Sequence, residues 1–151
     1  MNIAAWVRGV MSLYTPLSDV VGDRVYLIAL PQNPTYPSIS FLEPGTEEPG
    51  AADFTVHGFD TTGNLRNVRT RIRFRVHSSS AAEAYQVCDL VFDAFMDYVV
   101  NRDNYATAPP VKFGSVVHVR YGGNKDTYVA EVGSNGIGEY QRHLELVFLQ
   151  S

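Results

Sequence analysis

Between residues 69 and 76 the chain alternates strictly between arginine and uncharged side chains, reading Arg-Thr-Arg-Ile-Arg-Phe-Arg-Val. Successive side chains of a β-strand point to opposite faces, so this pattern predicts a strand with one basic face and one mainly apolar face. We call the basic set the arginine row: Arg69, Arg71, Arg73 and Arg75. Like charges about 6.6 Å apart on one pleat face repel one another, so carboxylates, phosphates or water must lie opposite them. What faces the row is therefore the main question about function.

The composition limits the classes of protein to consider. With 151 residues, 45% hydrophobic and 19% charged, we expect one globular domain spanning residues 1–151. A net charge of -4 argues against a general nucleic-acid binder. Cys88 is the only cysteine, which excludes an intrachain disulfide and favours a reducing compartment. No signal segment or membrane-length apolar run is evident, so we expect a soluble product of the cytoplasm.

The first half of the chain predicts one helix, two strands and a long loop. Apolar residues at spacings of three and four from Ile3 to Tyr14 predict an amphipathic helix that Pro16 should end. Strands are predicted at Arg24–Leu30 and Ser38–Phe41. Residues 43–67 are rich in glycine, proline and acids, and predict a long acidic loop with at most a short arm near Phe54–His57.

After the arginine strand, Ser80 and Glu83 have the spacing of a capping box. The helix that follows should bury a stripe of mainly apolar residues: Ala84, Val87, Cys88, Val91, Ala94, Phe95, Tyr98 and Val99. Glycine-containing turns then suggest a three-stranded meander, with strands at Phe113–Tyr121, Tyr128–Val132 and Glu139–Leu149. The expected fold is α+β: a mostly antiparallel sheet of about five to six strands, with two amphipathic helices on one face and the long acidic loop.

We identify no catalytic, metal-binding or cofactor-binding residues. The glycines of Gly133–Gly138 lack the order and the following helix of a dinucleotide loop. His57, His77, His118 and His143 lack the short helical spacing of a shared metal site. Ser78, Ser79 and Ser80 do not form a nucleophile elbow. Asp89, Asp93 and Asp97 lie on one helix face, where a solvated surface or a subunit contact is favoured over a cation site.

Two sources of carboxylates could face the arginine row. Glu139 and Glu145 share one face of the last strand and could pair with it inside one subunit. Alternatively, acids of another subunit, including Glu47, Glu48 and Asp53 of the loop, could meet it across an interface. A donor patch and a separate acceptor patch on one molecule make a heterologous contact, which can close into a ring.

The order of these features resembles the tail terminator, or tail completion, proteins of long-tailed bacteriophages. The resemblance rests on the first helix, on Val20-Val21-Gly22-Asp23-Arg24-Val25-Tyr26, on Leu30-Pro31-Gln32-Asn33 and on Tyr36-Pro37-Ser38-Ile39. It continues through the extended strand at 68–77, the helix at 81–98 and the strand at 140–148.

The resemblance implies a structural protein without enzymatic activity. Such a protein forms a homohexameric ring on the tail tube, stops tube polymerisation and offers a docking surface to the head–tail connector. DNA would pass through the ring without sequence-specific binding. The protein would be assembled in the host cytoplasm and lie at the head-proximal end of the tail in the virion.

Three alternatives stay open. A neck or head-closure protein would also form a ring between head and tail. A small ligand- or nucleotide-binding protein, or a small enzyme, would use the Gly133–Gly138 turn. Local DNA contact by the arginine row would give steeply salt-dependent affinity for duplex DNA.

Overall fold

The computed structural model describes residues 3–42, 55–59, 65–109, 116–129 and 138–150, with the side chains of 55–59, 65–69, 116–118, 120–129 and 149–150 left aside. The helices are α1 (Ile3–Leu13), α2 (Thr15–Val21), α4 (Ala81–Val100) and the 3-10 helix η2 (Arg102–Tyr105). The strands are β1 (Val25–Leu27), β2 (Ser38–Leu42), β3 (Thr55–Phe59), β4 (Leu65–Ser78), β5 (Val116–Val129) and β6 (Glu139–Gln150). The predicted α+β class is confirmed.

The described strands form one mixed sheet in the order β1-β2-β4-β6-β5, and β3 also pairs with β4. The pair β1–β2 is parallel and the other pairs are antiparallel. Strand β6 pairs with β4 from Val68 to Ser78, so β2 and β3 share the opposite edge of β4. The strand that carries the arginine row is therefore central in the sheet.

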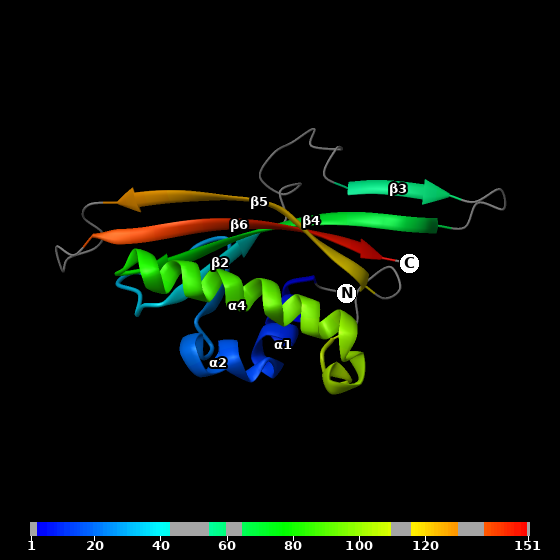
Figure 1. Ribbon diagram of the computed structural model, residues 1–151, viewed down its shortest axis with the longest axis horizontal. Coiled ribbons are helices and arrows are strands. Elements are labelled where there is room, and N and C mark those ends of the chain that lie inside the picture. The colour runs from blue at the N-terminus through cyan, green and yellow to red at the C-terminus, as the bar shows by residue number, and fades with distance from the viewer. Residues whose placement is uncertain (1–2, 43–54, 60–64, 110–115, 130–137, 151) are drawn as a thin grey trace.

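The three α-helices lie on one side of the sheet (Figure 1). Ile72, Phe74 and Val76 of β4 are buried on that side, as the alternation predicts. Trp6 of α1 packs its ring against Phe95 of α4 and Phe148 of β6, with centroids 5.5 and 5.4 Å apart. Aromatic rings thus pack α1 and α4 against the sheet.

Helix α4 follows its predicted pattern. Ser80 is the N-cap, and its hydroxyl accepts a hydrogen bond of 3.1 Å from the backbone N–H of Glu83. The reciprocal half of the capping box runs through a third residue, because the Ser80 N–H and the Glu83 carboxylate both bond to the Ser78 hydroxyl. The expected stripe is buried except Val99, which is partly buried.

The start of the chain differs from the prediction at Pro16. Helix α1 ends at Leu13, and Pro16 lies in the first turn of a second helix, α2, instead of simply ending the first. Proline suits this position, because the first N–H groups of a helix have no intrahelical acceptor. The described chain therefore has three α-helices where two were expected.

Three strand predictions also need correction. Gly122-Gly123-Asn124 is not a turn: β5 continues through it with a register shift between Tyr121 and Gly123, so the predicted meander is a two-stranded hairpin. The loop is predicted to extend to Asn67, but β4 already begins at Leu65. The strand predicted at Arg24–Leu30 is only β1, because Ile28 leaves the extended region with φ 72.

Candidate functional site

The arginine row lies on the sheet face turned away from the helices, which we call the outer face. Strand register places Ser40 of β2 opposite Arg75, and His143 and Glu145 of β6 opposite Arg75 and Arg73. Residues with the same alternation on the three strands share this face. The outer face is thus a polar surface built by β2, β4 and β6.

Glu145 bridges two members of the row inside the subunit. Its carboxylate oxygens lie 3.4 Å from a guanidinium nitrogen of Arg71 and 3.6 Å from one of Arg73. The three side chains are 18% exposed for Glu145, 34% for Arg71 and 31% for Arg73. The intrachain source of carboxylates therefore accounts for the middle of the row, where Glu145 contacts both Arg71 and Arg73.

Arg75 differs from these two arginines. Its Nε atom is buried, and among the described groups no atom accepts a hydrogen bond from it. A buried donor that lacks an acceptor costs about 1–3 kcal/mol, so its position requires an explanation. Arg75 is the member of the row whose counterpart the described subunit does not supply.

The other predicted interface residues are not brought together here. The backbone of Arg69 lies in β4, opposite Leu149, but its side chain is outside the description. Glu47, Glu48 and Asp53 lie outside the described residues. The structure therefore neither joins these three acids to the row nor separates them from it.

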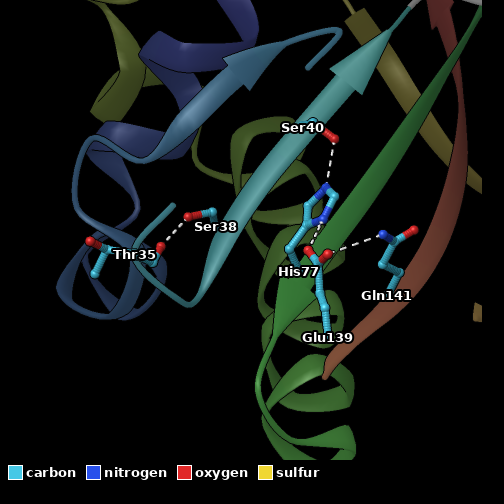
Figure 2. Close-up of polar contacts among 6 residues, drawn as sticks. All are labelled: Thr35, Ser38, Ser40, His77, Glu139 and Gln141. Atoms are coloured by element: carbon cyan, nitrogen blue, oxygen red, sulfur yellow. Dashed lines mark hydrogen bonds and ion pairs between the residues drawn. The ribbon is translucent and has the colours of Figure 1, made fainter. Parts of the chain in front are cut away.

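Glu139 does not pair with the row, because it bonds to His77. The His77 Nδ1 contacts the Glu139 carboxylate, and its Nε2 lies 2.9 Å from the hydroxyl oxygen of Ser40 (Figure 2). All three side chains are buried, and they come from β4, β6 and β2. Gln141 adds a hydrogen bond of 3.3 Å from its amide to the second carboxylate oxygen of Glu139. A buried polar chain therefore ties three neighbouring strands together.

A pocket of about 350 Å³ opens beside this chain of hydrogen bonds. One wall is the segment from Ile28 to Pro34, and the other is formed by Ser40, Arg75, His77 and Glu139. Ile28 and Asn33 have φ values of 72 and 54, in the left-handed region. A β-branched residue there is strained, and such strain tends to collect at functional sites.

The hydrogen bonds define what the pocket offers chemically. The His77 ring bridges the other two groups, with Nδ1 at the Glu139 carboxylate and Nε2 at the Ser40 hydroxyl. Ser40 and Arg75 both line this pocket. Burial, followed by the negative charge of Glu139, raises the pKa of the nearby Tyr36 phenol.

Sequence reasoning missed this site. It treated His77 as one of four scattered histidines and considered Glu139 only as a partner of the arginines. The available signal was the alternation itself, because His77 continues the phase of Arg71, Arg73 and Arg75.

The other candidate residues add no further site among the described residues. There, no three His, Cys, Asp or Glu side chains come together as a metal would require. Within the same part of the chain, no helix has the length and apolar character needed to cross a bilayer. Asp89 and Asp93 are exposed on α4, while Asp97 accepts hydrogen bonds from Asn101 and Tyr105. Residues 133–137 of the glycine turn lie outside the description.

No model of a known protein family matches this chain, and no curated protein matches it.

Proposed function

We propose that this chain is a structural tail terminator protein of a long-tailed bacteriophage. In this proposal it forms a homohexameric ring on the end of the tail tube, ends tube polymerisation and provides the docking surface for the head–tail connector. It acts without catalysis or a cofactor, and DNA passes through the ring without sequence-specific contacts.

The observation that supports this proposal best is the two-sided sheet. The helices and the aromatic core occupy one side, whereas the outer face carries the arginine row, of which Arg71 and Arg73 contact Glu145 and Arg75 lines the pocket. Arginine is suited to interfaces, because its planar guanidinium pairs with carboxylates in a defined geometry. Such contacts give specificity and register more than net affinity, which a ring on a tube requires.

The first test is the oligomeric state of the purified chain. We expect six-fold rings in negative-stain images and a hexameric mass by light scattering. Loss of the protein from the phage should give overlong tail tubes. Normal tubes with heads that leak DNA would instead assign the chain to head closure.

The second test reverses the charge of the outer face and keeps its internal pairs. Arg71→Glu with Arg73→Glu alone would place three carboxylates together, because Glu145 lies between these positions. Adding Glu145→Arg restores an opposite charge between them. We expect the triple variant to fold and to fail at tail capping. Infectious particles with tails of normal length would contradict the proposal.

One observation favours a second candidate function, a small hydrolase. Ser40, His77 and Glu139 are hydrogen-bonded in the order nucleophile, base and orienting carboxylate, and they line one pocket. Covalent labelling with a fluorophosphonate, followed by peptide mass spectrometry, would separate the two functions. Labelling of Ser40 that His77→Ala abolishes would favour the hydrolase, and its absence would favour a structural role.

A further inference from the structure

We infer that the pocket beside Ser40 and His77 is a socket for an acidic side chain of a neighbouring copy of this chain, with Arg75 as the residue that binds it. This inference rests on the proposed ring. It narrows the expected interface from the whole arginine row to one arginine and one pocket.

Arg75 differs from Arg71 and Arg73 in the ion pairs of the outer face. Glu145 pairs with Arg71 and Arg73, and Glu139 is held by His77. These two glutamates are the acids that sequence reasoning offered as counterparts within the subunit. Both are thus engaged elsewhere, and the buried Nε of Arg75 has no hydrogen-bond acceptor among the described groups. A carboxylate that enters the pocket meets Arg75 in its lining, and arginine presents its donors in the fork that binds both carboxylate oxygens.

The pocket is shaped for a side chain carried on a peptide. Its volume of about 350 Å³ lies at the lower end of ligand pockets. Ile28, which lines the pocket, and its chain neighbour Leu27 are large apolar residues that are exposed to solvent. An acidic residue with small or apolar neighbours would therefore bury its carboxylate at Arg75 and cover these two side chains.

The chain itself contains a segment of this chemistry. Residues 43–54 carry Glu43, Glu47, Glu48 and Asp53, contain no lysine or arginine, and include prolines, alanines and Phe54. Charge complementarity therefore makes this segment the occupant that we assign.

The direction of β2 favours a neighbouring copy over the chain's own segment. The strand runs from Ser38, opposite His77, to Leu42, opposite Arg73. Strand β2 thus ends at Leu42, beyond Ser40 in the direction away from His77. A strand end that points away from the pocket suits a heterologous contact, in which each copy offers its segment to the pocket of the next.

The primary experiment measures ring assembly of Arg75→Met by analytical ultracentrifugation across a concentration series. We expect the concentration for half-assembly to rise at least about tenfold, because a buried acceptor loses its charged donor. Arg142→Met is the matched control: it removes the same charge, but Arg142 stacks on Tyr85 of α4, on the helix side. The control should assemble within about twofold of the wild type. Equal assembly of Arg75→Met and wild type would overturn the inference and leave the ring intact.

A mixing experiment identifies the occupant. Arg75→Glu chains, and chains with Glu47→Arg, Glu48→Arg and Asp53→Arg, should each fail to assemble. Mixed together they should form rings, because alternation in a hexamer pairs each altered pocket with an altered segment and each native pocket with a native segment. A mixture that stays monomeric would show that these acids are not the occupant.

A wild-type chain that forms no ring would refute the proposed function. In that case a peptide-binding experiment still tests the socket. A fluorescent peptide of residues 42–54 is then titrated with the full-length chain, and its anisotropy is recorded. Binding that Arg75→Met weakens at least about tenfold would support the socket on its own. Absent binding, or equal binding by the variant, would refute it.

Discussion

At the scale of single residues, Glu145 supplies the carboxylate that contacts two arginines of the outer face. Glu145→Gln removes the carboxylate that contacts both Arg71 and Arg73. Because the pairs are partly exposed, we expect a loss of at most about 1 kcal/mol in the free energy of unfolding at low salt. The loss should shrink as salt screens the repulsion between the arginines. Urea titrations at low and high salt measure it, with Asp89→Asn on the exposed face of α4 as the control.

A second prediction at this scale concerns Tyr105. Its hydroxyl donates a hydrogen bond to Asp97, and burial, this bond and the charge of Asp97 together raise the pKa of its phenol above the ordinary 10.0. Tyr105→Phe should lower the free energy of unfolding by about 2 kcal/mol at pH 7, because a bond to a charged group is lost.

The effect of Tyr105 should depend on pH in one direction. Since the pKa is raised in the folded state, the stabilisation is complete below pH 10 and is lost as the pH rises above it. The difference between wild type and variant should therefore shrink above pH 10 in urea titrations. A constant difference from pH 7 to pH 11 would contradict the assignment.

The arginine row and its phase followed from the sequence, because alternation is a local property of one strand. The Ser40, His77 and Glu139 chain did not, since its members are far apart in sequence and meet only through the register of three strands. Likewise, the sequence suggested Glu145 as a partner of the arginine row. That it contacts both Arg71 and Arg73 follows only from the register of β4 and β6.

At the scale of elements, the N-cap of α4 offers a matched comparison. Ser80→Ala should lower the free energy of unfolding by about 1 kcal/mol, because the N–H of Glu83 loses its acceptor. Ser79 is exposed immediately before it, so Ser79→Ala should have little effect. Thermal or urea unfolding of both variants measures the difference, and equal stabilities would refute the cap.

Gly9 in α1 looks like a weak helix position, but the packing explains it. A Cβ at this position would lie 2.8 Å from Cδ of Pro109. The gain of about 0.8–1 kcal/mol that alanine brings to a helix should be outweighed by this overlap, so Gly9→Ala should be destabilising. In a Pro109→Ala background the same substitution should become neutral or stabilising. A double-mutant cycle measured by urea unfolding tests the coupling.

The element boundaries show where local patterns were insufficient. The run from Tyr121 to Lys125 has the composition of a turn, yet pairing with β6 carries β5 through it. Pro16 shows a different limit of local patterns. Proline occurs both just after the end of a helix and in the first turn of a helix, and only the packing of α2 decides between these two positions.

At the scale of the whole molecule, assembly should respond to salt. Assembly of a ring held by Arg75 and acidic groups should weaken between about 50 and 500 mM salt, because salt screens the attraction between the arginine face and the acidic segment while they are still apart and solvated. Analytical ultracentrifugation at several salt concentrations measures this. A ring that holds equally well or tightens at high salt would indicate an apolar interface and would argue against charge as its basis.

The parallel pairing of β1 with β2 could not be predicted from the sequence. It brings together two segments joined by a proline-rich connection, and no local pattern specifies its direction. By contrast, the α+β class followed from the order of helical and extended patterns, because each pattern reports its own local burial.

The central position of β4 also has a consequence for synthesis on the ribosome. Residues of β4 emerge after β2 and β3, but β6, which covers its other edge from Val68 to Ser78, emerges only after α4 and β5. Until then, the nascent chain carries an unpaired strand edge, and the part of α4 that packs on β5 and β6 is uncovered. Chaperone capture or premature association of polysome-bound chains is therefore most favoured in that interval, before the last strand closes the sheet.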